Sequence, residues 1–150
     1  LRLWVCGQGK EGKVILEERM KLDNRIKYFG VLNKDEIFKI QRSADLLINP
    51  RPNGNKNFNR YSFPSKLMEY FASGTPVAMF KLPGIPEEYY EHCYIIENES
   101  SEGIAQTINS VFSEDIEKRI TKSLNARQFI LKYKNASFQT KKVLKMIKHL

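Results

Sequence analysis

The feature of this sequence that most limits its fold is an alternation, over the first hundred residues, of short apolar runs with segments of helical periodicity. The apolar runs predict strands at residues 1–7, 25–30, 46–50, 76–80 and 94–97. Helical periodicity predicts helices at residues 8–23, 33–45, 64–73 and 101–113. The rest of the chain is expected to be helical to its end, with a break near residues 134–137.

Runs that are apolar throughout indicate strands that are buried on both faces. With a helix between successive strands, they predict an α/β fold built on a parallel sheet with helices on both faces. Ligands of such sheets bind beyond the carboxyl ends of the strands. Every candidate functional residue lies in a loop expected at that edge, after residues 7, 30, 49 and 80.

The formal charge is +8, because 25 Lys and Arg residues outnumber 17 Asp and Glu residues. This excess favours anionic partners such as nucleotides, phospholipid headgroups or nucleic acid, or it serves solubility alone. The two cysteines, Cys6 and Cys93, are too far apart in sequence for a disulfide framework or a metal-binding spacing. Reduced thiols are therefore expected, which points to the cytosol.

No apolar run approaches the roughly 20 residues that span a bilayer. The first residues, LRLWVCGQGK, also lack the basic head and long apolar stretch of a signal peptide. They have the character of a buried strand, so we expect a piece cut from a longer protein.

The segment with the clearest chemical content is the expected helix start in PSKLMEYFAS, residues 64–73. Pro64 suits the first helical position, because its φ is preset and it has no amide to leave unpaired. The amides of Ser65, Lys66 and Leu67 then lack intrahelical partners and point outward at the positive end of the helix dipole. Together with the Ser65 hydroxyl and the Lys66 ammonium, they predict a site for a phosphate or diphosphate.

Glu69 lies on the same helical face, four residues after Ser65 and three after Lys66. One helical turn is about 5 Å, similar to the separation between a phosphate and its sugar hydroxyls. A carboxylate accepts from two vicinal hydroxyls at once, so one short helix would hold a nucleoside diphosphate by phosphate and ribose. The alternative is a surface ion pair between Lys66 and Glu69 above an ordinary apolar core stripe.

Residues 49–89, NPRPNGNKNFNRYSFPSKLMEYFASGTPVAMFKLPGIPEEY, resemble the C-terminal, nucleotide-sugar-binding domain of retaining GT-B glycosyltransferases. They are most similar to family 4, the glycosyl transferases group 1, in the branch that builds capsular polysaccharides and exopolysaccharides. The specific part is SFPSKLMEYFASGTPV, and LRLWVCGQGK, RIKYFG and ADLLINPR precede it in the matching order. NARQFILKYKNASF resembles the closing helices of the family, so the likeness covers almost the whole chain.

The resemblance implies that residues 1–150 form a Rossmann-like domain, which holds a nucleotide-sugar donor in a cleft shared with an N-terminal acceptor domain. Glu69 matches the second Glu of the family motif and is implied to bind the ribose hydroxyls. The resemblance places Phe63, Pro64, Ser65 and Lys66 along the diphosphate, Val31 and Leu32 near the base, and Gly7 and Gly9 in a loop facing the cleft. For the two glycines, a tight strand-to-helix turn is an equal alternative.

Two departures from the family pattern concern this site. The motif often has another Glu eight residues before Glu69, where this chain has Tyr61. Asn57, Asn59 or the Tyr61 hydroxyl would have to replace that carboxylate at the donor sugar. The basic phosphate ligands of the family usually precede the first strand, and that segment and the acceptor domain are absent here, so the chain alone is expected to be inactive.

The function implied by the resemblance is transfer of a sugar, with retention, from a nucleotide donor to a glycan or lipid-linked acceptor. The enzyme would act in the cytoplasm or at the inner face of the membrane. The donor is a substrate, no cofactor or metal is expected, and the sequence has no Asp-x-Asp pair. No residue of this chain is assigned a catalytic role.

Two alternatives remain open. A nucleotide-sugar 2-epimerase shares the fold, but its acid and base carboxylates and its His have no counterpart that can be placed here. A basic membrane-surface module would use the tail SFQTKKVLKMIKHL, an amphipathic helix whose lysines suit anionic lipid. The same helix would otherwise pack back across the domain junction. Nucleic acid is not expected, because no aromatic platform or binding motif accompanies the charge.

Overall fold

The computed structural model describes residues 1–52, 54 and 56–148. The chain divides into two compact units, unit 1 (Leu1–Ile40) and unit 2 (Gln41–Leu150), and each is described by itself. The α/β fold expected from the sequence is confirmed, because every strand pair in either unit is parallel and helices connect the strands. Asn53 and Asn55 of the expected polar loop, and His149 and Leu150 of the basic tail, lie outside the described residues.

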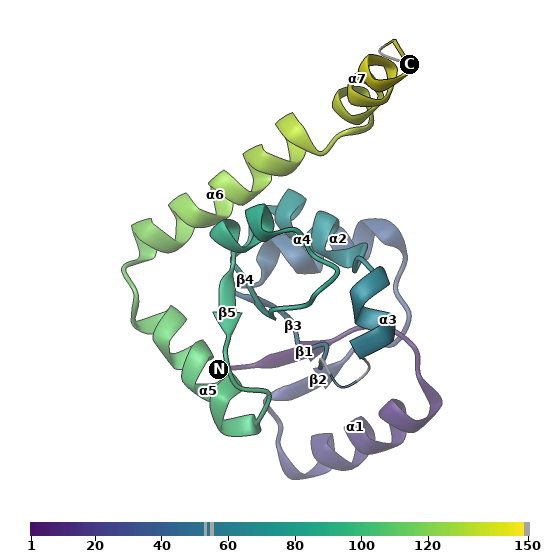
Figure 1. Ribbon diagram of the computed structural model, residues 1–150. Helices are drawn as coiled ribbons and strands as arrows, with labels where there is room; N and C mark the ends of the chain where they lie inside the picture. The colour runs from purple at the N-terminus through teal and green to yellow at the C-terminus, as the bar shows by residue number, and fades with distance from the viewer. Residues whose placement is uncertain (53, 55, 149–150) are drawn as a thin grey trace. The chain divides into compact units, whose positions relative to one another are not determined.

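Unit 1 contains a two-stranded sheet with a helix between its strands (Figure 1). Its elements are β1 (Leu3–Val5), α1 (Lys10–Leu22), β2 (Ile26–Tyr28) and most of α2 (Lys34–Ser43). The expected burial on both faces is wrong for β1, where Leu3 is 49% exposed and Trp4 41% exposed. The reason within the unit is that α1 packs mainly against β2, so the side chains of β1 are left with little cover.

Unit 2 is built on a three-stranded parallel sheet in the order β3 (Leu47–Asn49), β4 (Val77–Phe80) and β5 (Tyr94–Ile96). Its helices are α3 (Lys56–Tyr61), α4 (Lys66–Ser73), the 3-10 helix η1 (Glu87–His92), α5 (Ser101–Ser113), α6 (Ile116–Tyr133) and α7 (Ala136–Ile147). Leu47 pairs with Val77, and Ala78 pairs with Tyr94.

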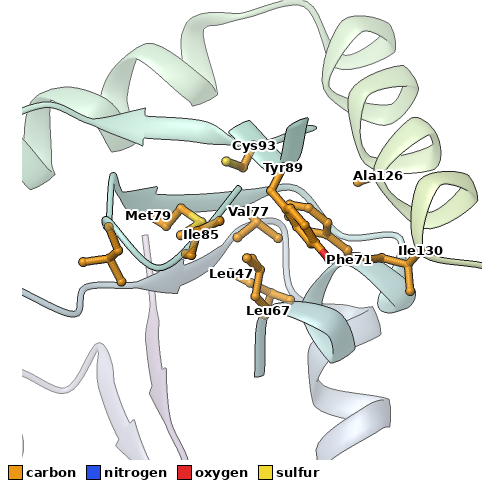
Figure 2. Close-up of a cluster of buried hydrophobic side chains, with 11 residues drawn as sticks. Leu47, Leu67, Phe71, Val77, Met79, Ile85, Tyr89, Cys93, Ala126 and Ile130 are labelled. Carbon is orange, nitrogen blue, oxygen red and sulfur yellow. The ribbon is translucent and has the colours of Figure 1, made fainter. Parts of the chain in front are cut away.

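The central strand β4 separates two apolar layers. Val77 and Met79 point to the layer that α4 and α6 cover, where Leu67, Phe71, Ala126 and Ile130 are buried (Figure 2). Ala78 and Phe80 point to the opposite layer, where they pack with Ile96 of β5 and Ile104 of α5. Because side chains alternate along a strand, the uninterrupted apolar run of β4 fills both layers. The prediction of a sheet with helices on both faces is therefore confirmed for unit 2 (Figure 1).

The ends of the unit 2 helices show why they begin and end where they do. Helix α4 ends at Gly74, whose φ of +80° is the left-handed conformation that favours glycine. The break near residues 134–137 is confirmed, because Asn135 caps α7 by accepting a hydrogen bond from the amide of Phe138 at 2.8 Å. Among the described helices, none combines the length and the apolar character that a membrane span requires.

In the described part of the chain, Cys6 and Cys93 form no disulfide. Cys93 is buried in the layer covered by α4 and α6, and burial raises the pKa of its thiol to about 12. Its role is therefore that of a small apolar core residue. Within the described residues, no three His, Cys, Asp or Glu side chains gather into a set that could hold a metal ion.

Candidate functional site

The candidate site lies in unit 2, in the chain between the carboxyl end of β3 and the start of α4. Residues 51–62 are expected to be a polar loop, but the structure forms α3 within them. The Asn-rich sequence is a weak helix former, so tertiary contacts account for this helix. The side chain of Asn59 is 2% exposed and its Nδ2 donates to the carbonyl of Pro52 at 3.0 Å. Arg51 also donates to the Ser62 hydroxyl, at 3.4 Å.

The start of α4 differs from the prediction in two respects: Pro64 is not its first residue, and one of the three expected free amides is paired. The helix begins at Lys66, with Ser65 as its cap residue, so Pro64 precedes the helix. The amide of Leu67, expected to be unpaired, donates to the carbonyl of Pro64 at 2.9 Å. Met68 donates to Ser65 at 3.1 Å, so the first turn is tightened by bonds of the 3-10 type. In the described part of the chain, the amides of Ser65 and Lys66 make no hydrogen bond, so two of the three predicted donors are available.

The charged side chains at this helix start do not pair with each other. Lys66 and Glu69 are both exposed, and the ion pairs found among the described residues involve neither of them. The alternative of a surface ion pair within α4 is therefore not what the structure contains. One exposed ammonium and one exposed carboxylate, three residues apart on one helical face, remain open to a ligand.

Phe63 and Tyr61, also predicted for the site, lie in different environments. The Phe63 ring is half-buried and meets the Tyr89 ring edge to face, with centroids 5.2 Å apart. This contact anchors the segment before α4 to the core. Tyr61, at the end of α3, is 82% exposed, and the guanidinium of Arg60 lies 5.6 Å from its ring centroid. Asn59 is committed to Pro52, and the side chain of Asn57 lies outside the described structure.

The predicted residues of unit 1 follow its two strands. Gly7 has a φ of +130°, and its amide donates to the carbonyl of Gly30 at 2.8 Å. The Tyr28 hydroxyl donates to the Gly7 carbonyl at 2.6 Å, so the loops after β1 and β2 are bonded together. Gly9 is exposed immediately before α1.

Val31 and Leu32 follow directly after Gly30, with Val31 71% exposed and Leu32 half-buried. The expected roles of these two residues near the base, and of the glycines at the cleft, stay predictions. The structure thus brings Gly7 into contact with the loop that carries Val31, and it groups Phe63, Pro64, Ser65, Lys66 and Glu69 around the start of α4.

Sequence reasoning missed two features at this edge of unit 2. Asn49, the last residue of β3, has a buried side-chain nitrogen with no hydrogen-bond partner among the described residues. Gly84, in the loop after β4, lies so close to the carbonyls of Asn59 and Ser62 that a Cβ there would be 2.5 Å and 2.9 Å from their oxygens. The glycine in the sequence FKLPGIP indicates a close approach of two backbone segments. The sequence does not indicate that the second segment is the one containing Asn59 and Ser62.

The start of α4 is an open surface. A hollow of about 290 Å³ lies elsewhere in unit 2, between β5 and α5, where Gln106, Thr107 and Ser110 contribute to its wall. Its lining contains no Lys, Arg, His or Cys. The unpaired amides and charges favour the start of α4 as the functional site over this hollow.

Comparison with known proteins supplies independent observations. A family model described as glycosyl transferases group 1 matches residues 1–114. No curated protein sequence matches the chain. Among solved structures, Anabaena Alr3699/HepE in complex with UDP-glucose superposes with a TM-score of 0.73 and 20% identity, over 99% of this chain and 41% of that one. The same protein has also been solved with UDP and glucose and with UDP.

Two further structures are similar. WaaG, described as a glycosyltransferase involved in lipopolysaccharide biosynthesis, has a TM-score of 0.64 and 21% identity, over 87% of this chain and 34% of that one. The C-terminal domain of LpcC, a glycosyl transferase group 1 family protein from Francisella tularensis, has a TM-score of 0.63 and 25% identity, over 83% of this chain and 63% of that one. The chain therefore spans less than half the length of HepE and WaaG.

Proposed function

Because the chain belongs to the glycosyl transferases group 1 family, we propose that it binds the nucleotide part of a sugar donor for a glycosyltransferase. The observation that carries the proposal is the start of α4, where two unpaired amides, an exposed Lys66 and an exposed Glu69 occur within one helical turn. The amides of Ser65 and Lys66 and the Lys66 ammonium would bind the pyrophosphate. Glu69, one turn along, would accept hydrogen bonds from the two ribose hydroxyls.

The same groups would assist the reaction. As the bond between the sugar and the nucleotide breaks, negative charge develops on the departing diphosphate. Fixed amide dipoles and a nearby ammonium stabilise that charge without reorganisation, which is how preorganised sites lower a barrier. In this proposal the transfer retains the anomeric configuration, and Val31, Leu32, Gly7 and Gly9 line the nucleotide site as the family resemblance implies.

The acceptor would be held by an N-terminal domain of the intact enzyme. The match to a solved C-terminal domain of a group 1 glycosyltransferase supports the proposal that donor and acceptor are bound by different domains. A glycan or lipid-linked acceptor in polysaccharide synthesis remains our proposal for the intact enzyme. A 2-epimerase is not favoured, because the matching family model is one of transferases.

Uridine diphosphate is the first ligand to test, since HepE, similar in fold, has been solved with UDP and UDP-glucose. UDP at about 100 times its Kd should stabilise the intact enzyme by about 2.7 kcal/mol. For a domain of 150 residues, that corresponds to a rise in Tm of about 5–10 °C, and the rise is smaller for a longer intact enzyme. UMP should bind at least about tenfold more weakly, because it lacks the phosphate that completes the contact with the amides.

GDP, ADP and CDP in the same thermal-shift series would identify the base. The proposal would be contradicted if no nucleoside diphosphate raised Tm, or if UMP and UDP bound equally well. Inorganic pyrophosphate serves as the matched control, because it can engage the amides but not Glu69. It should bind more weakly than the preferred nucleoside diphosphate.

Contact with an anionic membrane surface is a second candidate role, and it is favoured by α7. Four apolar side chains of this helix are 52–70% exposed: Val143, Leu144, Met146 and Ile147. At 3.6 residues per turn, Lys141, Lys142, Lys145 and Lys148 gather on the other side of the helix. An exposed apolar face bordered by lysines is the pattern of a helix that lies in a membrane interface.

Vesicle sedimentation tests this second role with the intact enzyme. Phosphatidylcholine vesicles containing phosphatidylglycerol should pellet the protein, and Leu144→Glu should release it because a charge would enter the apolar face. Equal sedimentation with and without phosphatidylglycerol would contradict an electrostatic contact. Retention of the Leu144→Glu protein on the vesicles would contradict the assigned face.

A further inference from the structure

The loop after β4, residues 81–86, packs directly beneath the chain that leads into α4. At Gly84 there is no room for a side chain, since a Cβ would meet the Asn59 oxygen at 2.5 Å and the Ser62 oxygen at 2.9 Å. Leu82 and Ile85, on either side of Gly84, are 2% and 5% exposed and belong to the core. Leu82 and Ile85 therefore anchor the loop to the core, while Gly84 contacts the backbone of the segment that leads into α4.

One hydroxyl group fastens this loop. The Tyr90 oxygen accepts a hydrogen bond from the Leu82 amide at 2.9 Å and donates one to the Leu82 carbonyl at 2.7 Å. Both backbone groups of Leu82 are thus satisfied by the same side-chain atom. Burial raises the pKa of Tyr90, so the hydroxyl keeps its proton at neutral pH and can donate and accept together.

The neighbouring residue holds the same segment by a second contact. Tyr89, also in η1, is 6% exposed and carries the half-buried ring of Phe63. Helix η1 therefore supports the chain before α4 at two points. The Tyr89 ring contacts Phe63 directly. Tyr90 acts on Ser62 indirectly, through the loop that contains Leu82 and Gly84. Ser65, whose free amide is part of the proposed anion site, lies only three residues beyond Ser62.

We propose that Tyr90 is a positioning residue for donor binding, which acts by holding Gly84 against the Ser62 carbonyl and so setting the direction of the Ser65 and Lys66 amides. This inference rests on the proposed function, since it assumes that those amides bind the diphosphate. Tyr90 itself touches no ligand in this scheme. Its hydroxyl fixes the loop, the loop fixes the Ser62 carbonyl, and Ser62 precedes the two binding amides by three and four residues.

The test is Tyr90→Phe in the intact enzyme, with UDP binding followed by titration calorimetry. The ring and its packing stay, but the Leu82 amide loses its partner and the Leu82 carbonyl keeps only the hydrogen bond from the Ile85 amide at 3.1 Å. We expect Kd for UDP to rise about fivefold to tenfold while the stoichiometry stays at the wild-type value. A merely structural defect would instead lower the stoichiometry, through loss of folded protein, and leave Kd unchanged.

Tyr94→Phe is the matched control. Tyr94 is another half-buried tyrosine of unit 2 and its hydroxyl donates to Glu114, but it packs in the layer on the opposite face of the sheet from α4. Both variants should lower Tm by about 5 °C for the loss of buried hydrogen bonds. Only Tyr90→Phe should raise Kd for UDP. If both variants bind UDP with the wild-type Kd, the positioning role is overturned.

A second variant covers the case in which Tyr90→Phe does not fold. Gly84→Ala pushes the same loop away from Asn59 and Ser62 and should raise Kd for UDP by a similar factor. An unchanged Kd in Gly84→Ala would also overturn the inference. Failure of the proposed function gives a different result, because the wild-type enzyme would then bind no nucleoside diphosphate at all. If wild type binds UDP and Glu69→Ala weakens it, only the variants at Tyr90 and Gly84 decide this inference.

Discussion

Replacing Glu69 with alanine is expected to weaken UDP binding by about 100-fold. The carboxylate is proposed to accept hydrogen bonds from both ribose hydroxyls, and hydrogen bonds to a charged group contribute about 1.5–3 kcal/mol each. Because the side chain is exposed and partly solvated in the free enzyme, we expect a total near 3 kcal/mol, which is about two decades in Kd. Glu117→Ala, at an exposed glutamate in the first turn of α6, is the control and should leave Kd unchanged.

A deoxynucleotide makes this prediction specific to the ribose. Wild-type enzyme should bind 2′-deoxyuridine diphosphate about tenfold more weakly than UDP, since one of the two hydroxyls is missing. Glu69→Ala should bind the two ligands equally, because the partner of that hydroxyl is gone. If Glu69→Ala still preferred UDP by the wild-type factor, the two groups would not be coupled and the assignment of Glu69 to the ribose would be wrong.

The second large effect is expected on stability, at Phe71. Its side chain is fully buried and stacks on Tyr89, with ring centroids 6.2 Å apart (Figure 2). The Phe71 ring also meets the ring of His92 edge to face. Phe71→Ala should lower the free energy of unfolding by about 3–5 kcal/mol, because it removes apolar contacts and leaves a cavity. That is a large part of the roughly 5–15 kcal/mol that stabilises a typical domain.

Urea unfolding followed by far-UV circular dichroism measures this loss. Tyr61→Ala is the control, because an 82% exposed side chain contributes little and the change should stay within about 0.5 kcal/mol. A loss below about 1 kcal/mol in Phe71→Ala would mean that the layer between β4, α4 and α6 repacks around the deletion. The close-packed cluster described here would then not be what holds unit 2 together.

Much of the fold could be predicted because hydrophobic periodicity is a local signal. The expected strand at 76–80 corresponds to Val77–Phe80, and the expected helix at 33–45 corresponds to Lys34–Ser43. What the sequence did not reveal depends on polar contacts that hydrophobic periodicity does not encode. Helix α3 forms where Asn59 finds the Pro52 carbonyl, and no periodic apolar pattern announces it.

The candidate site was predicted in the same uneven way. The chemistry of Ser65, Lys66 and Glu69 follows from residue type and spacing along one helix, and among the described ion pairs none involves Lys66 or Glu69. The bond from Leu67 to Pro64 was missed, because residue type and spacing do not decide between 3-10 and α geometry in the first turn of a helix. The contact of Gly84 with Asn59 and Ser62 was missed because it joins segments more than twenty residues apart. The bonds from Tyr90 to Leu82 span a shorter stretch of chain, but no periodic pattern indicates them.

The double-sided burial of β4 has a consequence for how such a protein can diversify. None of its four side chains is more than 4% exposed. A polar replacement on either face would therefore bury a polar group without water to hydrogen-bond it. Heritable variation that keeps the protein folded is thereby confined to the loops that emerge from the strand ends. Ligands of parallel sheets bind at loops of this kind, so the ligand preference of such a fold can change while the strands beneath the loops stay constant.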